Sequence, residues 1–169
     1  MNLAGRGGRR RGFTLIEMAV VLAVMGIMFA IATPPWRRYR ASMSAQASAQ
    51  ELRAELTFLQ SRSIDLEEEC FLRIDSATQY STYLIPVSQY SASARPYKRI
   101  VVGNDGLQLS PSGAGTLLVF GSKGWVDTTK STVTSSGSGG STYYPITVSA
   151  PNVLNVSVRT YLNGRVLVQ

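Results

Sequence analysis

The sequence of 169 residues contains no histidine and a single cysteine, Cys70. Without histidine, the chain has no imidazole to act as a general base, a proton relay or a metal ligand. A lone cysteine excludes an internal disulfide and any paired-cysteine metal or redox site. We therefore expect no metal and no cofactor. The sequence also lacks GxSxG, SxxK, P-loop and GxGxxG arrangements, so we expect a structural protein and not an enzyme.

Charged residues are scarce as well, at 16% of the chain, whereas 44% of the residues are hydrophobic. This composition excludes both a disordered chain and an ordinary, highly charged cytosolic protein. The net charge of +7 is unevenly distributed. Residues 1–12 carry four arginines and no acid, residues 13–33 carry only Glu17, and residues 70–169 carry eight basic and three acidic side chains.

Residues 13–33 form a long hydrophobic run, in which 18 of 21 residues are apolar or glycine. As a helix this run would be about 31 Å long at ~1.5 Å per residue, which matches a hydrocarbon core of ~30 Å. It therefore predicts a transmembrane helix. Glu17 is anomalous there, since an ionisable group at the centre of such a helix costs about 2.5–3.5 kcal/mol. No lysine or arginine in the run can pair with it, but a free α-amine at Phe13 could.

The residues around the start of this run resemble a known signal. Gly12, Phe13 and Glu17, in the sequence GFTLIE after a basic leader, resemble the class III signal of type IV pilins and pseudopilins. The resemblance implies that a prepilin peptidase cleaves after Gly12, removes the leader 1–12 and N-methylates Phe13. It also implies that Glu17 neutralises the terminal amine of a neighbouring subunit during filament assembly.

Two other interpretations of the N-terminal segment remain open. Arg10 and Arg11 resemble a twin-arginine export signal, and residues 30–32 resemble a cleavage site for ordinary secretion, which would release a free domain. Alternatively, residues 13–33 are a plain membrane anchor. Both interpretations leave Glu17 unexplained.

The orientation of the predicted membrane helix rests mainly on the leader resemblance. Four arginines precede the hydrophobic run and three follow it closely, which is a weak positive-inside bias. We expect a single-pass protein in bacterial inner-membrane lipid, with its head on the periplasmic side, that later enters a pilus or pseudopilus.

Residues 34–69 predict an amphipathic continuation of the helix. Pro34 and Pro35 should kink or locally break it, because proline lacks the amide donor and clashes with the preceding turn. Beyond them, apolar residues recur at spacings of three and four. This spacing predicts a stripe that packs against the head, formed by Ala45, Ala49, Leu52, Leu56 and Leu59. The acidic run 67–69 should end the helix on a solvated surface.

Residues 70–169 predict a β-rich head, because short β-branched and aromatic runs alternate with turn residues. The strands are expected over 71–74, 83–87, 100–102, 107–109, 117–120, 146–148, 154–162 and 165–168. No βαβ alternation is present. The fold class is therefore α+β, with a long N-terminal helix packed on an antiparallel β-sheet head.

Three local features of the head carry further expectations. Asn163-Gly164 is typical of a type I′ hairpin, and residues 104–106 are typical of a turn. Residues 131–142, rich in serine, glycine and threonine, should form a mobile loop. Cys70 should be a small buried hydrophobic residue.

The head also resembles a narrower family. The motifs are residues 59–63 near the helix end, Val119-Phe120-Gly121 with Gly124-Trp125, and Asn163-Gly164-Arg165-Val166. They resemble the GspH/FimT-like pseudopilins. The resemblance implies a minor subunit of a type IV pilus or of a type II secretion pseudopilus, with other pilin subunits and the prepilin peptidase as partners.

DNA is a second candidate partner. FimT-like minor pilins of transformable bacteria resemble this chain and bind DNA through basic C-terminal residues with a GRxR motif. Gly164, Arg165 and Val166 match its first three positions, but Leu167 replaces the second arginine. The basic residues that would attract phosphates, with salt-sensitive binding, are Arg159, Arg165, Lys123 and Lys130. Scattered solvated charge is the alternative, and the sequence leaves pilus, secretion and DNA-uptake systems open.

Overall fold

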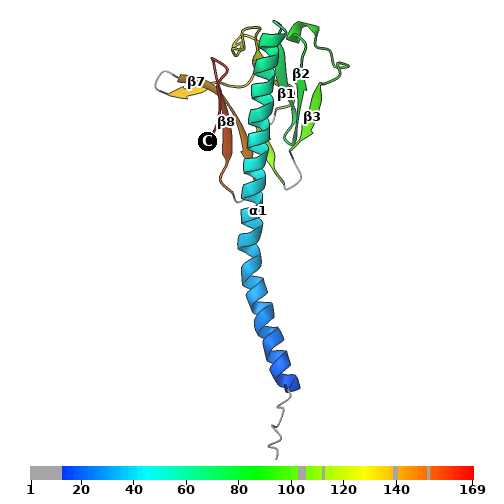
Figure 1. Cartoon of the computed structure of the whole chain (residues 1–169), viewed down its shortest axis with the longest axis vertical. Coiled ribbons are helices and arrows are strands. Elements are labelled where there is room, and N and C mark those ends of the chain that lie inside the picture. Colours follow the sequence, from blue (N-terminus) through cyan, green and yellow to red (C-terminus); the bar gives the residue numbers. More distant parts are fainter. Residues whose placement is uncertain (1–12, 103–105, 112, 139–140, 152) are drawn as a thin grey trace, which may run out of the picture. The chain divides into compact units, whose positions relative to one another are not determined.

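The computed structural model describes residues 13–102, 106–111, 113–138, 141–151 and 153–169 (Figure 1). The chain divides into two compact units, Met1–Arg37 and Arg38–Gln169. Helix α1 (Leu15–Asp65) begins in the first unit, and the second unit contains the rest of α1 together with every described strand.

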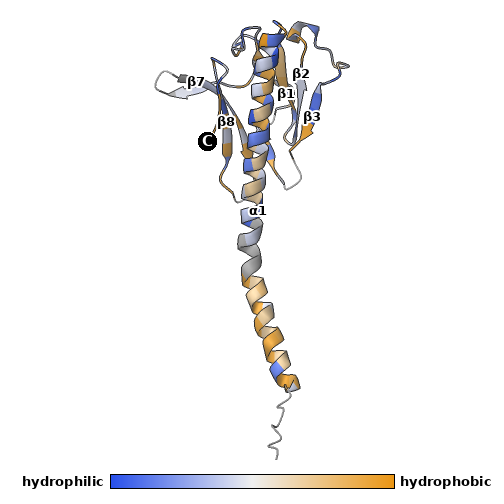
Figure 2. Cartoon of the chain, in the orientation of Figure 1, coloured by the Kyte–Doolittle hydropathy of each residue, from blue (hydrophilic) through white to orange (hydrophobic). Residues whose placement is uncertain are grey.

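The first turn of α1 is capped by Thr14. The Thr14 Oγ1 accepts a hydrogen bond from the backbone N–H of Glu17 at 3.3 Å, as an N-cap residue does. Beyond this cap, the large hydrophobic side chains between Phe13 and Ile31 are 42–88% exposed, and Figure 2 shows how apolar these turns are. No helix among the described residues is long and apolar enough to cross a membrane.

Helix α1 runs through Pro34 and Pro35 as one element of 51 residues, so the expected local break is wrong. Proline fixes φ near −65°, which is a helical value, and the helical backbone therefore persists although each proline lacks a donor. The helix ends at Asp65 and not within the acidic run. Glu67 follows with φ 53°, a left-handed conformation that stops helical geometry before the run ends.

The head contains two antiparallel sheets (Figure 1). Sheet A has the order β3 (Lys98–Val101), β2 (Gln79–Tyr83), β1 (Cys70–Ser76), β5 (Thr116–Phe120). Sheet B has the order β4 (Gln108–Ser110), β7 (Ser141–Ser149), β8 (Val156–Tyr161), β9 (Val166–Val168), and β6 (Ser136–Ser138) also pairs with β7. The α+β class is confirmed.

The predicted apolar stripe of α1 packs into the main core. Its members are at most 1% exposed: Ala45, Ala49, Leu52, Leu56 and Leu59. They cluster with side chains of both sheets, among them Leu72 of β1 and Val158 of β8. The stripe is thus confirmed as core, and it fixes which face of the helix the sheets cover.

A second, smaller core lies on the opposite face of sheet A. Phe71, Tyr83 and Val119 are at most 3% exposed, and residues of the segment 84–97 pack over them. The Phe71 and Tyr83 rings stack at 4.8 Å, and Tyr90 meets both rings edge-on. The strand expected over 83–87 is therefore displaced. The strand ends at Tyr83, and the apolar residues after it cover the sheet and include a short 3₁₀ helix (Val87–Gln89).

The mobile loop expected over 131–142 is wrong in its described part. Ser136 pairs with Tyr143, and Gly137 pairs with Thr142. Earlier in the segment, the hydroxyl oxygens of Ser131 and Thr132 accept hydrogen bonds from the backbone of β5 at 3.0 and 2.7 Å. Backbone pairing orders this segment although it has little apolar surface to bury.

The hairpin between β8 and β9 is confirmed, but its turn type differs. Type I′ requires positive φ at both central residues, whereas only Gly164 (φ 82°) has it, and Asn163 does not. The backbone N–H of Tyr161 donates to the Arg165 carbonyl, and the Tyr161 carbonyl accepts from the Gly164 N–H, both at 2.8 Å. This pattern is that of a three-residue loop closed by a left-handed glycine. In the turn expected at 104–106, residues 104 and 105 lie outside the described residues.

Candidate functional site

The N-terminal candidate residues lie at the start of α1. Gly12 is outside the described residues, Phe13 is 73% exposed, and Glu17 is exposed in the first helical turn. Among the described residues, Glu17 forms no ion pair. Its carboxylate lies in the first turn, near the positive end of the helix dipole. The acid is thus available to a cation from another chain.

Thr14 is a residue that the sequence analysis missed at this site. The spacing Thr-x-x-Glu from Thr14 to Glu17 is that of a capping box, a signal readable from the sequence. The observed bond from the Glu17 amide to Thr14 supplies one half of this motif. Thr14 therefore fixes where the helix starts, and with it the position of Glu17 in the first turn.

The three head motifs meet at one junction, formed by Gln60 of α1 and by the turns that contain Gly124 and Gly164. The Gln60 Nε2 donates to the Asn163 carbonyl at 3.4 Å. A Cβ on Gly164 would lie 2.7 Å from the Gln60 Cδ and would overlap the Gly124 carbonyl oxygen. A Cβ on Gly124 would lie 2.7 Å from the Ile64 Cδ1. Both turns therefore need glycine to approach the helix this closely.

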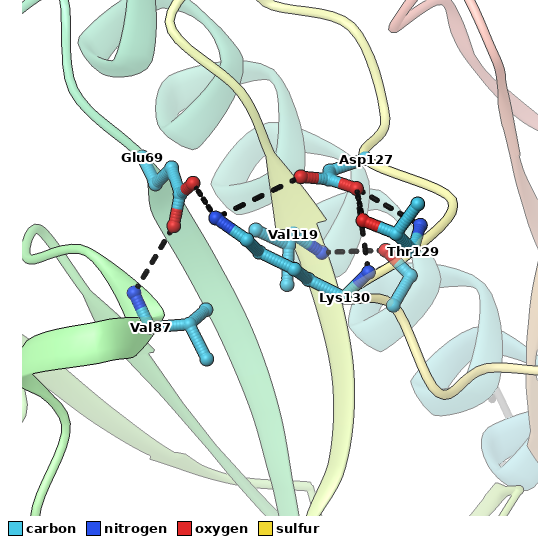
Figure 3. Close-up of polar contacts among 7 residues, drawn as sticks. Glu69, Val87, Val119, Asp127, Thr129 and Lys130 are labelled. Carbon is cyan, nitrogen blue, oxygen red and sulfur yellow. Dashed lines mark hydrogen bonds and ion pairs between the residues drawn. The ribbon is translucent and has the colours of Figure 1, made fainter.

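Lys130, a predicted DNA contact, is engaged within the head. Figure 3 shows it between Glu69 and Asp127: its Nζ pairs with the Glu69 carboxylate and lies 4.0 Å from the Asp127 Oδ2. The hydrogen bond to Glu69 raises the pKa of Lys130. The other Glu69 oxygen accepts a hydrogen bond from the Val87 amide at 3.2 Å. This cluster therefore links the residue directly before β1 to the segment 84–97.

Asp127 is the acceptor that organises the turn beside this cluster. Its Oδ1 accepts from the Thr129 hydroxyl at 2.6 Å and from the Thr129 and Lys130 amides at 2.9 and 3.3 Å. The hydroxyl hydrogen bond in particular lowers the pKa of Asp127. These carboxylates neutralise Lys130 and leave it poorly suited to bind phosphate.

The other three predicted DNA contacts lie on strand β8 and on the two turns of the junction. Arg159 lies on β8, and its guanidinium is 4.6 Å from the centroid of the Tyr143 ring. Lys123 and Arg165 are exposed, and each is adjacent to a glycine of the touching turns. Trp125, 63% exposed, lies in the same turn region as Lys123. The structure therefore places Lys123 and Arg165 on touching turns, whereas Lys130 is held in an ion-pair cluster with Glu69 and Asp127.

Cys70 is fully buried, as expected, and burial raises its pKa to about 11. Such a thiol is protonated at neutral pH and therefore unreactive. Within the described ranges, no group of three or more histidine, cysteine, aspartate or glutamate residues could hold a metal ion.

Comparison with known proteins gives both a motif and a fold. Residues 7–33 match the family described as the prokaryotic N-terminal methylation motif. The chain is 28% identical over 97 residues to a fimbrial protein of Pseudomonas aeruginosa, a match that covers 57% of this chain and 63% of that protein's length. It is 25% identical over 126 residues to the type IV major alpha-pilin of Moraxella bovis, covering 74% and 77% of the two chains.

Among solved structures, the type IV minor pilin FimU of Pseudomonas aeruginosa has a similar fold, with a TM-score of 0.53 and 13% identity, over 74% of this chain and 87% of that one. The chain thus combines an N-terminal methylation motif with the pilin fold, a long helix packed on antiparallel β-sheets. The type IV pilins to which it is similar in sequence are structural proteins and not enzymes. In sequence the chain is similar to type IV pilins, and it carries their N-terminal methylation motif.

Proposed function

We propose that the chain is a minor type IV pilin or pseudopilin. A prepilin peptidase cleaves between Gly12 and Phe13 and methylates Phe13, residues 13–33 hold the subunit in the inner membrane with its head on the periplasmic side, and the subunit then enters a filament. The observation that carries the proposal is the exposed apolar surface of Phe13–Ile31, whose one charge, Glu17, has no ion-pair partner among the described residues.

The energetics give Glu17 a specific role. Lipid is as apolar as the core of a helix bundle, so moving the helix from lipid into a filament gains little hydrophobic free energy. An unpaired carboxylate in lipid is unfavourable, by up to about 2.5–3.5 kcal/mol at the helix centre and by less near its end. Pairing with the Phe13 α-amine of a neighbour would relieve this penalty and set the axial register.

The head supports the finer assignment to a minor subunit. The three motifs that resemble the GspH/FimT-like pseudopilins converge on the contact between Gln60, Gly124 and Gly164. Residues distant in the sequence thus form one packed unit, which is the expected result if the motifs preserve a common head architecture.

Mass spectrometry of the membrane-extracted protein tests the proposal. A chain that begins at N-methylated Phe13 supports it. A chain that begins at Thr33 indicates ordinary secretion, and one that begins at Met1 indicates a plain anchor. Glu17→Gln should also prevent entry into filaments, because the amide cannot pair with an α-amine as an ion.

DNA binding is a second candidate function, favoured by one observation. Lys123 and Arg165 lie on touching turns near exposed Trp125, and neither forms an ion pair among the residues described. Two basic groups beside an exposed indole suit a phosphate backbone with an unstacked base. Binding of single-stranded DNA should fall steeply with salt and be lost in Lys123→Ala/Arg165→Ala. Lys130→Ala is the matched control and should bind normally; absence of binding at low salt refutes this function.

A further inference from the structure

The second unit, Arg38–Gln169, has an uncovered end where α1 enters it. Successive helical residues are rotated by ~100°, so three consecutive residues point to three sides of a helix. Arg38, Tyr39 and Arg40 are all exposed. The head begins to cover α1 at Ala41, which packs against the main core. At residues 38–40 the helix is therefore open on three sides.

This end carries positive charge that no acid of the described head neutralises. In the described part of the chain, neither Arg38 nor Arg40 forms an ion pair. The first acidic residue along α1 after Glu17 is Glu51, about three turns beyond Arg40. A partner for these two guanidinium groups should therefore be anionic.

The arginines beside the apolar run 13–33 lie on an unusual side of it. Cleavage after Gly12 would remove the four arginines that precede the run, whereas Arg37, Arg38 and Arg40 would remain on its head side. Arginines that flank a membrane helix are normally enriched on the cytoplasmic side. With the head in the periplasm, these three arginines therefore require a local partner.

An exposed leucine lies at the same end of the unit. Leu154 is 89% exposed, the highest value among the large hydrophobic side chains of the described residues. It belongs to the loop between β7 and β8, which Figure 1 shows at the end where α1 enters the unit. Val153 packs against the main core, and its amide donates to the Ala150 carbonyl at 3.3 Å. The loop is thus held at its base while Leu154 faces outward.

We infer that this end of the unit docks on anionic phospholipid headgroups, with Arg38 and Arg40 bound to lipid phosphates and Leu154 inserted into the lipid. The inference rests on the proposed function, because the bilayer must hold residues 13–33. Headgroups lie directly outside the hydrocarbon core, and Arg38 follows the apolar run by only five residues. Arginine binds phosphate through two parallel hydrogen bonds. A bilayer also surrounds a helix, so it contacts several sides at once, and tyrosine, here Tyr39, is typical of the membrane interface.

An environment-sensitive fluorophore on Leu154→Cys tests the contact. The native thiol, Cys70, is buried, so the label reacts with the new cysteine. The membrane-extracted chain is placed, one copy per disc, in nanodiscs of phosphatidylcholine with or without phosphatidylglycerol. The emission should shift to the blue only in discs that contain phosphatidylglycerol. The same label on Ser122→Cys is the control and should emit alike in both discs, because exposed Ser122 lies near Gly124, which is close to Ile64 at the other end of the head.

The charge is tested with the same label on Leu154→Cys. Each arginine near an anionic bilayer surface contributes about fivefold to binding. Arg38→Gln/Arg40→Gln should therefore lower the ratio of docked to undocked heads about thirtyfold in the phosphatidylglycerol discs. Arg53→Gln is the matched control and should leave this ratio unchanged. Arg53 is also exposed on α1 and has no ion pair among the described residues, but it lies more than three turns beyond Arg40.

The outcomes separate the inference from the proposed function. If the chain is embedded in both kinds of disc but the emission of the Leu154→Cys label does not depend on phosphatidylglycerol, the inference is refuted and the proposed function stands. A blue shift that appears only when several chains share a disc indicates contact between copies, and it also refutes the inference. If the chain does not enter the discs at all, the membrane-held subunit of the proposed function fails as well.

Discussion

Replacement of Gly164 by alanine tests the junction between α1 and the two turns. The left-handed backbone at φ 82° costs an L residue about 1–2 kcal/mol. The added Cβ would overlap the Gly124 carbonyl oxygen and crowd Gln60, and overpacking of this kind costs a further ~1–3 kcal/mol. We expect Gly164→Ala to lower the free energy of unfolding by about 2–5 kcal/mol, measured by urea denaturation followed by circular dichroism.

Gly115 supplies the matched control for this measurement. It has a similar φ of 88°, but an added Cβ there meets no atom within 4 Å. Gly115→Ala should therefore show the backbone term alone, about 1–2 kcal/mol. The entropic effect of alanine on the unfolded chain is common to both variants and cancels in the comparison. Equal losses in the two variants would refute the close approach at the junction.

Three further predictions concern the head. Leu56→Ala should cost about 2–5 kcal/mol of unfolding free energy because it opens a cavity in the core, whereas exposed Thr57→Ala should stay within about 0.5 kcal/mol; similar values would contradict the burial of the stripe. Cys70 should not react with a thiol reagent at pH 8 until the head unfolds, and rapid labelling of the native protein would contradict its raised pKa of about 11. The pKa of Asp127 is lowered from its ordinary value of 3.8 in the folded state, so the ionised carboxylate stabilises the fold at pH values above 3.8. This stabilisation is lost as the pH falls through the folded-state pKa. In Asp127→Asn, the urea midpoint of unfolding should therefore fall less steeply with decreasing pH than in the unsubstituted protein. An unchanged dependence of the midpoint on pH would contradict the stabilising role of the Asp127 carboxylate.

The elements that could be predicted from the sequence are those in which apolar residues recur at a regular spacing. The stripe from Ala45 to Leu59 was predicted residue by residue, because burial on one side of a helix imposes a spacing of three and four.

The errors arose where one residue type serves two structural roles. The apolar residues after Tyr83 indicated a strand, but they cover the outer face of sheet A. The serine- and threonine-rich segment indicated a loop, yet Ser131 and Thr132 use their hydroxyls to bind the edge of β5. The junction residues were recognised only through a resemblance, because no local pattern shows that Gln60 meets Gly164.

Strand β1 is shielded in every direction. It pairs with β2 on one edge and with β5 on the other, α1 covers one of its faces, and the segment 84–97 covers the other. Its amide hydrogens can therefore exchange with solvent deuterium only when the whole head opens, so their exchange rates report the global free energy of unfolding. Edge strand β9 lacks such shielding, and its amides should exchange through local fraying long before those of β1.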